Sequence, residues 1–353
     1  MIPLEALRGV RTILAHAYPD GPCADGLAAA MICKDVLPDA DVVLLAHETV
    51  AYEKLAPTPG MLFVDITPPP ETAGAFREAG AIVLDHHDDK EDLIASFGDR
   101  GVFAHSKRQP GVSGALLAFW EVWLPLQTEL DAVRAAMEMT PLPDMVPPGH
   151  IHRFLPDMVP PGHIHRFAVL AGIRDTWQKQ DLRWMEACEQ AAVLLFYNPS
   201  EWLDDRPLDG ARLHRRLAFG RDLVARYRRE TAALVEHAYR FKTSWGARVV
   251  VLPSARISDA VELLPETDIV VGFSYHSLDA PSLKLSFRSP KREDGVDVSR
   301  IARTLKGGGG HRHSAGASLR LDLGFTSADL NPYNEIKTLL ETTAVTRALG
   351  VGA

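Results

Sequence analysis

Three short apolar runs in the first 90 residues each lead into acidic side chains. The runs span 11–15, 61–64 and 81–84, and the carboxylates that follow them are Asp20, Asp25, Asp65 and Asp85. Short apolar runs bounded by turn residues are typical of buried strands. In open parallel sheets the carboxyl ends of the strands form the edge at which ligands bind. The pattern therefore predicts an α/β domain whose parallel sheet gathers these carboxylates at one edge.

The chain is long enough for two domains. Its 353 residues exceed what one hydrophobic core usually supports. Strand patterns resume near Trp245, after a long amphipathic, Arg-rich stretch from about 213 to 239 that predicts a connecting helix. We predict an N-terminal domain over 1–197, a helical connector over 198–243 and a smaller α/β domain over 244–353.

Composition narrows the class of protein. The net charge of −8 argues against a protein that coats long nucleic acid, because such proteins carry broad basic surfaces. No apolar run approaches the roughly 20 residues that span a bilayer, and the first residues show no basic leader. We therefore expect a cytoplasmic protein with no membrane partner, and a homodimer is compatible with the sequence. The three cysteines lack CxxC spacing, which argues against disulfides and against a cysteine zinc site.

The run 81–84 ends in Asp85-His86-His87, a carboxylate followed by two imidazoles. Several carboxylates and imidazoles gathered in a partly buried site repel one another unless cations lie between them. Carboxylate and imidazole donors without thiolate suit Mn²⁺ or Mg²⁺. Two such cations bridged by a carboxylate are a common device for hydrolysing phosphate esters. The sequence therefore predicts a metal-dependent phosphoesterase centre.

A second set of residues predicts an anion site in the C-terminal domain. Four glycines, 307–310, precede His311, and glycines let the backbone N–H groups approach an anion closely. Arg288 and Ser289 end a predicted strand over 283–289, and an arginine there can bind a phosphate through two nitrogens. A flexible linker is the alternative interpretation of the glycine run.

The segment LPDMVPPGHIHRF occurs twice in tandem, over 142–154 and 155–167. A perfect 13-residue repeat is too short for a solenoid, so we interpret it as a duplication in an exposed loop that tolerates insertion. Metal binding by its His-x-His pairs is the less favoured alternative; the histidines are His150, His152, His163 and His165.

Together these motifs resemble the DHH phosphoesterase superfamily with its DHH-associated C-terminal domain. The resemblance rests on the following motifs, in this order: a His/Asp loop after the first strand, Val64-Asp65, Asp85-His86-His87, Arg174-Asp175-Thr176-Trp177, Arg288-Ser289 and the glycine run with His311. It covers nearly the whole chain. It implies two divalent cations, usually Mn²⁺ with Mg²⁺ or Co²⁺ as alternatives, in a cleft between two α/β domains.

The resemblance also implies roles for individual residues. Asp65 matches the bridging ligand, His86 and Asp175 match ligands of one cation, and His87 matches the histidine that faces the substrate phosphate. Asp85 is expected to orient the two histidines rather than bind metal. The residues that match the substrate-binding part of the C-terminal domain are Arg288, Ser289, Gly309, Gly310 and His311.

The first motif departs from the family pattern, because Pro22 stands where an aspartate is common. In one interpretation, His16 and Asp20 bind one cation and Asp25 takes a third position. In the other, the segment 23–26 forms the Asp-Gly turn and Asp20 replaces the usual histidine. Both interpretations keep Asp20 and Asp25 as ligands.

The resemblance implies a phosphodiesterase that hydrolyses short oligonucleotides or linear dinucleotides to mononucleotides. The family includes RecJ-type exonucleases, nanoRNases, cyclic-dinucleotide phosphodiesterases and pyrophosphatases. A phosphatase acting on a 3′,5′-bisphosphonucleoside or on polyphosphate is the first alternative. A non-catalytic nucleotide-binding protein of the same fold is the second.

Overall fold

The computed structural model describes residues 2–18, 21–46, 52, 54–104, 112–129, 162–203, 208, 210–254, 257–275, 282–290, 292, 295–305, 308–320 and 331–351. The chain divides into two compact units, Met1–Val224 and Ala225–Ala353, and the division falls inside one long helix. We describe each unit by itself.

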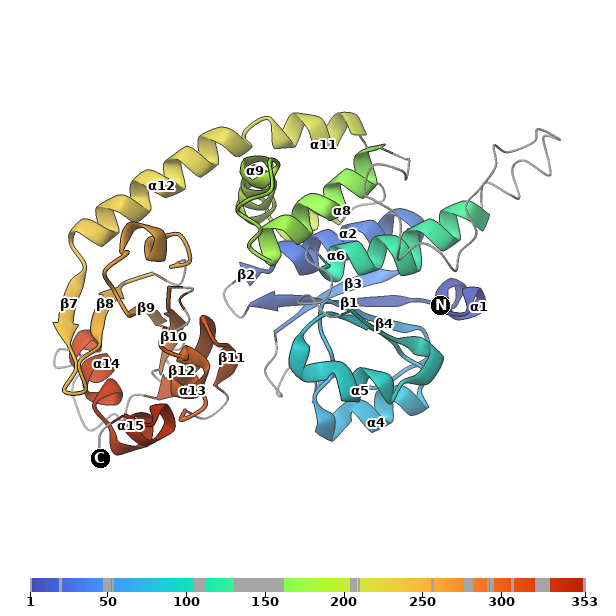
Figure 1. Ribbon diagram of the computed structural model, residues 1–353. Helices are drawn as coiled ribbons and strands as arrows, with labels where there is room; N and C mark the ends of the chain where they lie inside the picture. The colour runs from blue at the N-terminus through green and yellow to red at the C-terminus, as the bar shows by residue number, and fades with distance from the viewer. Residues whose placement is uncertain are drawn as a thin grey trace. The chain divides into compact units, whose positions relative to one another are not determined.

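The N-terminal unit is built on a parallel sheet (Figure 1). Its strands are β1 (Thr12–Tyr18), β2 (Gly21–Pro22), β3 (Asp41–Leu45), β4 (Met61–Val64), β5 (Ile82–Asp85) and β6 (Gly101–Phe103). The parallel strands lie in the order β3-β1-β4-β5-β6, and the short β2 folds back antiparallel on the end of β1. β1, β4 and β5 are therefore neighbours, and their carboxyl ends meet at one edge, as the sequence predicts.

Helices cover both faces of this sheet (Figure 1). α4 (Pro70–Glu78) and α5 (Glu91–Ala95) lie on one face, where Phe63, Phe76 and Ile94 belong to one buried cluster. α2 (Ala24–Val36) lies on the other face, and packs against β1 and α6 (Gly114–Ala118). Residues 25–33 of α2 are all buried. This is why the helix is rich in alanine: small side chains let neighbours approach it from several sides.

Shorter elements complete this part of the unit: α1 (Leu4–Arg8), the 3₁₀ turns Asp88–Lys90 and Gly98–Arg100, and a π-helical stretch, Phe119–Trp123, that continues α6.

The end of the tandem repeat is helical. α8 (Gly162–Asp175) begins six residues earlier than the helix that the sequence predicts from Ala168, and it takes in the last six residues of the second copy. His165 is buried with its ring centroid 5.1 Å from that of Phe119, and His163 Nε2 lies 3.2 Å from the backbone oxygen of Leu208. Among the described residues, neither histidine belongs to a group that could hold a metal ion. The rest of the repeat, 142–161, lies outside the described residues, so the loop prediction for it stays a prediction.

Deleting residues 155–167 is expected to leave metal binding intact. The remaining copy, 142–154, then runs directly into Ala168, so the six residues that begin α8 are still present in the same order. Shortening a loop changes its closure entropy only slightly, so the free energy of unfolding should change by less than about 0.6 kcal/mol. Metal stoichiometry and urea unfolding of the deletion variant check this. Loss of a bound metal would show that the repeat takes part in the site.

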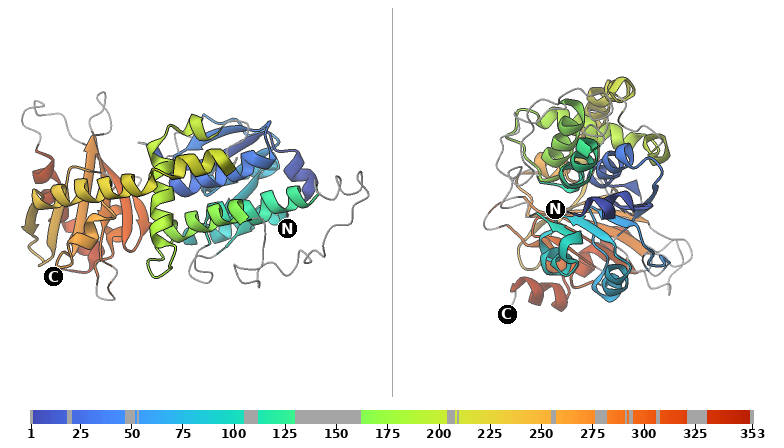
Figure 2. Two further views of the ribbon diagram at one scale, coloured as in Figure 1. Left: turned by 90° about the horizontal axis from the view of Figure 1, so that it is seen from above. Right: turned by 90° about the vertical axis from the view of Figure 1, so that its right-hand side faces the viewer.

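The remaining helices before the C-terminal unit form a series. They are α9 (Trp184–Phe196), α10 (Pro199–Trp202), α11 (Gly210–Leu217) and α12 (Gly220–Glu236). The predicted connecting helix over 213–239 is therefore two helices, with a break at Ala218 and Phe219 just before Gly220. α12 is uninterrupted over 17 residues (Figure 2, yellow). None of the helices within the described residues has the length and apolar character that crossing a bilayer requires.

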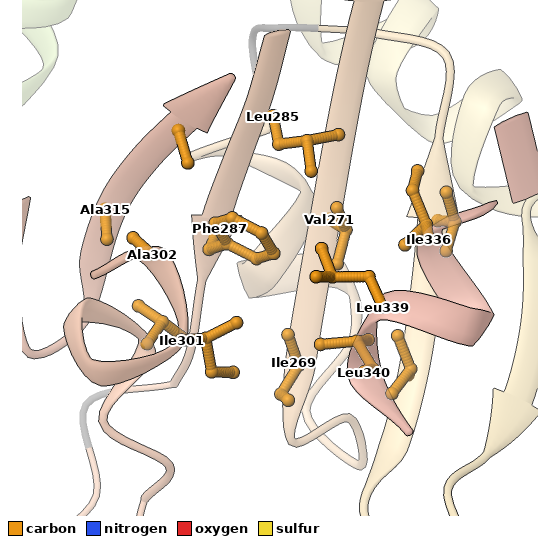
Figure 3. Packing of buried hydrophobic residues seen from close by; sticks show 14 of the residues in the cluster. Ile269, Val271, Leu285, Phe287, Ile301, Ala302, Ala315, Ile336, Leu339 and Leu340 are labelled. Carbon is orange, nitrogen blue, oxygen red and sulfur yellow. The ribbon is translucent and has the colours of Figure 1, made fainter. Parts of the chain in front are cut away.

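The C-terminal unit is a mixed sheet with helices on it. The strands are β7 (Tyr239–Lys242), β8 (Arg248–Leu252), β9 (Ile269–Tyr275), β10 (Ser282–Arg288), β11 (Gly309–His311) and β12 (Ser314–Arg320). They lie in the order β11-β12-β10-β9-β8-β7, and only β8 and β9 are parallel among the described pairs. Alternate residues of β9 and β10 point into a core shared with α13 (Val298–Ala302), α14 (Pro332–Leu340) and α15 (Thr343–Leu349), as Figure 3 shows for Val271, Leu285 and Phe287. A 3₁₀ turn, Ala260–Leu263, belongs to a smaller cluster that also contains Val250 and Val270.

Candidate metal centre

Four site residues come from the carboxyl ends of β4 and β5. Asp65 follows β4 directly, and Asp85, His86 and His87 follow one another from the last residue of β5. Asp65 has a left-handed backbone with φ of 60°, an uncommon conformation for a residue other than glycine. Strained backbone of this kind is concentrated at functional sites. The left-handed backbone of Asp65 lies directly after β4, and from this position its carboxylate reaches the neighbouring side chains.

The two carboxylate oxygens of Asp65 face two different groups of side chains. Oδ1 lies 3.0 Å from His86 Nε2. Oδ2 lies 3.4 Å from His16 Nδ1, on β1, and 3.7 Å from Cys23 Sγ, at the start of α2. Asp65 therefore stands between two sets of donor atoms, as a ligand shared by two cations would.

His86 brings the acidic residues of α2 and α8 together. Its Nε2 lies 3.8 Å from Asp25 Oδ2 and 3.6 Å from Asp175 Oδ2. Asp175 is the last residue of α8, and its side chain keeps 31% of its surface exposed. Asp25 is buried in the first turn of α2. The side of this group formed by Asp175 is therefore open to solvent.

Asp25 is held in place by the start of α6. Its carboxylate accepts hydrogen bonds from the backbone N–H groups of Gly114, at 2.6 Å, and Ala115, at 3.1 Å. A Cβ atom at Gly114 would lie 2.4 Å from Asp65 Cβ, which is closer than real contacts allow, and 3.0 Å from Asp25 Oδ2, which is tight. Glycine at this position is what lets α6 approach both carboxylates.

Asp85 orients the two histidines and lies behind the donor groups. It is fully buried and accepts hydrogen bonds from Thr67 Oγ1 at 2.6 Å, from the His86 backbone N–H at 2.7 Å and from His87 Nδ1 at 2.6 Å. A carboxylate that fixes the ring of a neighbouring histidine is a common feature behind metal ligands. This arrangement supports the orienting role that the sequence predicts for Asp85.

Burial and neighbouring charges shift the pKa values of several groups in the centre away from their ordinary range. Burial, and then the charges of Asp65 and Asp175, raise the pKa of Asp25 well above its usual range. Burial and the nearby carboxylates likewise raise the pKa of the Cys23 thiol. Burial alone would lower the pKa of His86, but the hydrogen bond with Asp65 and the surrounding carboxylates raise it well above its ordinary value. Burial alone would raise the pKa of Asp65, but the hydrogen bonds from His16 and His86 hold it well below its ordinary value.

The donor set fits divalent cations. Ligand atoms lie within 4.8 Å of one another in three overlapping groups: His16, Cys23 and Asp65; Asp25, His86 and Asp175; and Asp65, Asp85, His86 and His87. Asp25 and His86 lie beside a buried, anionic space between oxygen and nitrogen donors, where a cation is favoured and competes with protons for the same donor atoms. Asp65 belongs to the first group, and its Oδ1 lies 3.0 Å from His86 Nε2, a member of the second group, so that it connects the two.

Asp85 is expected to keep His87 protonated in the metal-free protein. Burial lowers the pKa of His87, but the charge of Asp85 and the hydrogen bond to it raise that pKa from 6.5 to about 9. Because the folded value is raised, this contribution to stability is fully present below pH 6.5 and is lost as the pH rises toward 9. NMR titration of the His87 ring in metal-free protein should give an apparent pKa near 9. In the Asp85→Asn variant the midpoint should fall to 6.5 or lower, and an unchanged midpoint would contradict this role for Asp85.

The predicted substrate residues of the C-terminal unit are placed as follows. Arg288 ends β10, where Nε donates to Ser258 Oγ at 3.1 Å and Nη1 donates to the Phe287 backbone oxygen at 2.9 Å. The buried Ser289 hydroxyl donates to the Val296 backbone oxygen at 2.8 Å and lies 3.0 Å from His313 Nδ1. Ser289 is thus already engaged in contacts within the unit.

The last two glycines of the run are part of a hairpin and not of a flexible linker. Gly309 and Gly310 lie in β11, at one edge of the sheet, paired with β12. Gly310 has φ of 126°, and a Cβ there would lie 2.6 Å from the Ser314 backbone oxygen, whereas a Cβ at Gly309 would meet nothing within 4 Å. Backbone geometry therefore requires glycine at 310 but not at 309. The side chain of His311 lies outside the described residues.

The structure brings together most of the predicted ligands and adds others. The predicted residues that meet in the centre are His16, Asp25, Asp65, His86 and Asp175, with His87 and Asp85 beside them. Asp20 lies outside the described residues. Sequence reasoning missed Cys23, Thr67 and Gly114, and the only signal for Cys23 is its place two residues before Asp25 in an acidic loop.

Comparison with known proteins identifies the fold. No protein-family model matches the chain, and no curated protein matches it. Among solved structures, the DHH domain of a member of a family of ribosomal proteins aligns with a TM-score of 0.50 and 14% identity over 99% of this chain and 88% of its own. The chain has the DHH fold. The fold class predicted from the sequence is thereby confirmed.

Two more distant structures align over nearly the whole chain. One is a pGpG-specific phosphodiesterase from Vibrio cholerae, with a TM-score of 0.39 and 12% identity over 97% of this chain and 100% of its own. The other is an exopolyphosphatase-related protein from Bacteroides fragilis, with a TM-score of 0.39 and 10% identity over 96% of this chain and 94% of its own. The fold assignment rests on the DHH-domain structure alone.

Proposed function

We propose that this chain is a metal-dependent phosphodiesterase that hydrolyses short oligonucleotides or linear dinucleotides to mononucleotides with two divalent cations. The observation that carries the proposal is the position of Asp65. One of its oxygens faces His86, and the other faces His16 and Cys23. A carboxylate with one oxygen toward each of two donor groups is the arrangement that a two-cation phosphoesterase needs.

The residues around the proposed cations have different roles. The chemistry that two cations would supply when bound is a water activated as nucleophile and compensation of charge on the phosphoryl oxygens. Asp65 fixes the spacing of the two donor groups, and the Gly114 and Ala115 N–H groups hold Asp25 toward His86. His87 is held through Nδ1 by Asp85, so any hydrogen bond that it donates to a substrate phosphate comes from Nε2. A protonated imidazole held in this way can give a proton to an oxygen of the reacting phosphate.

A short substrate is the better match to the charge of the chain. Binding along a polymer relies on neutralising many phosphates with basic side chains, and the net charge here is −8. A few local contacts suffice for a dinucleotide. We assign these contacts to Arg288, to the backbone of Gly309 and Gly310 and to His311, with Ser289 positioning the end of β10 through its bond to Val296.

The direct test is hydrolysis with Mn²⁺ of three substrates offered separately. These are a labelled RNA dinucleotide, a five-nucleotide RNA and a 3′,5′-bisphosphonucleoside, each with the His87→Ala variant as control. We expect cleavage of the two oligonucleotides and its loss by about 10²–10⁴-fold in the variant, the usual contribution of an acid–base group. Turnover of the bisphosphonucleoside alone would replace the proposal with a small-molecule phosphatase. No turnover of any substrate would favour a non-catalytic nucleotide-binding protein.

A further inference from the structure

Cys23 lies inside the metal centre. It is the residue that precedes α2, it is buried, and its Sγ donates toward Asp65 Oδ2 at 3.7 Å. Together with a ring nitrogen of His16 and the Asp65 carboxylate it forms a group whose ligand atoms are all within 4.8 Å of one another. The sequence predicts a centre of carboxylates and imidazoles without sulfur, whereas the structure adds a thiol to one donor group.

A second cysteine, in the helix that Cys23 precedes, provides a comparison with a buried thiol outside the centre. Cys33 is also buried in α2, and burial alone raises the pKa of its thiol. At Cys23 the charges of Asp65, Asp175 and Asp25 add to the effect of burial. A thiol that only fills space has no reason to face carboxylates. Cys23 therefore faces the carboxylates of the centre, whereas Cys33 serves packing within α2.

We infer that Cys23 is a metal ligand, and that with His16 and Asp65 it forms a nitrogen–sulfur–oxygen site that prefers Zn²⁺, Fe²⁺ or Co²⁺ to Mn²⁺ and Mg²⁺. The group of Asp25, His86 and Asp175 forms the second site, which lacks sulfur and suits Mn²⁺ or Mg²⁺. The inference rests on the metal centre of the proposed function but does not depend on the reaction or its substrate. On binding, the Cys23 thiol releases its proton to solvent and the sulfur binds as thiolate.

Distances between donor atoms support this assignment. Around a tetrahedral cation with bonds of about 2.0–2.3 Å, neighbouring ligand atoms lie about 3.3–3.8 Å apart. The separation of His16 Nδ1 and Asp65 Oδ2 is 3.4 Å, and that of Cys23 Sγ and Asp65 Oδ2 is 3.7 Å. Both pairs already stand at ligand spacing.

Charge balance supports it as well. Within the described residues, the anionic ligands of the centre are the carboxylates of Asp25, Asp65 and Asp175, since Asp85 is paired with His87. Two divalent cations bring one positive charge more than these three carboxylates offset. A thiolate at Cys23 adds a negative charge beside these carboxylates, which reduces the cost of burying the cations.

The metal preference follows from the donors. Thiolate and imidazole favour zinc and the later divalent metals, whereas carboxylate and water suit magnesium and manganese. Asp65 takes part in both sites, so only Cys23 distinguishes them by softness. The two sites of one centre are therefore expected to select different cations from a mixture.

Cobalt spectroscopy on the full chain tests the sulfur ligand directly. We expect Co²⁺ added to the metal-free protein to give a near-ultraviolet thiolate-to-cobalt charge-transfer band. The Cys23→Ser variant should lose the band, and the matched variant Cys33→Ser should keep it. Co²⁺ binding without a charge-transfer band in the unaltered protein, or a band that survives in Cys23→Ser, would overturn the inference.

Metal competition tests the preference. When metal-free protein is equilibrated with equal concentrations of Zn²⁺ and Mn²⁺ and then separated from free metal, we expect elemental analysis to find more zinc in the unaltered protein than in the Cys23→Asp variant. Loss of a ligand should cost at least as much as loss of a group behind one, so Cys23→Ser should weaken Zn²⁺ binding by about 100-fold or more. Cys23→Asp should restore two cations but shift the bound metal toward Mn²⁺. Equal zinc content in Cys23→Asp and the unaltered protein would contradict the selectivity.

The outcomes separate this inference from the proposed function. A charge-transfer band in a protein that hydrolyses none of the three substrates would support the sulfur ligand and overturn the phosphodiesterase. Hydrolysis by a protein that binds cobalt without a charge-transfer band would do the reverse.

Discussion

Replacing Asp65 by asparagine is expected to abolish binding of both cations and to reduce hydrolysis by on the order of 10⁴-fold, the effect seen when one member of a catalytic unit is removed. The two oxygens of Asp65 serve the two donor groups, so loss of its charge weakens both sites at once. Asparagine is the appropriate replacement because it tolerates the left-handed backbone at this position, whereas alanine would add strain. Metal analysis and calorimetric titration with Mn²⁺ measure the loss.

The matched control is Asp41→Asn, which removes a carboxylate from the exposed start of β3. It should bind metal and hydrolyse substrate like the unaltered protein. Both variants should also unfold cooperatively in the metal-free state, which shows that the loss in Asp65→Asn comes from the site. If Asp65→Asn retained one cation at full affinity, Asp65 would belong to one site and would not be shared.

Strand ends are the part of the site that the sequence predicts well. Asp65, Asp85 and His86 follow short apolar runs, and parallel strands must bring their carboxyl ends to one edge. This rule predicts which residues lie at the same edge of the sheet. It does not predict which side-chain atoms contact one another there. No sequence pattern signals the backbone φ of 60° at Asp65, or that its two oxygens face different groups.

Residues supplied by helices were harder to predict. Asp175 is far from the other ligands in sequence, and only the family resemblance pointed to it. The sequence does not indicate Cys23 as a ligand, because cysteine sites are usually recognised by pairs. Here a single sulfur lies beside a histidine of β1 and the carboxylate that follows β4. The sequence predicts an anion-binding segment at the glycine run, with a flexible linker as the alternative, and neither interpretation predicts a strand, because glycines are unfavourable in strands. In the structure Gly309 and Gly310 lie in β11, where Gly310 has a positive φ and packs closely on β12.

Gly114 is a position where a single methyl group is expected to disrupt the centre. By helix propensity alone, Gly114→Ala should be favourable, because Gly114 begins α6. The added Cβ would instead lie 2.4 Å from Asp65 Cβ and 2.9 Å from Asp65 Cγ, so α6 or Asp65 must move. Overpacking of this kind costs about 1–3 kcal/mol. Displacement of Asp65 should also weaken the binding of both cations, which metal titration and urea unfolding measure together.

Gly74→Ala is the matched control for this change. Gly74 lies inside α4, where an added Cβ would meet nothing within 4 Å, so the substitution should stabilise the protein by about 0.5–1 kcal/mol. The two variants make the same chemical change in helices on opposite faces of one sheet, yet we expect stability to change in opposite directions and metal affinity to fall only in Gly114→Ala. Equal metal affinity in both variants would mean that α6 does not hold the two carboxylates at this distance. In that case the position of Asp25 would have to be set by α2 alone, and the hydrogen bonds from Gly114 and Ala115 would not be needed for binding.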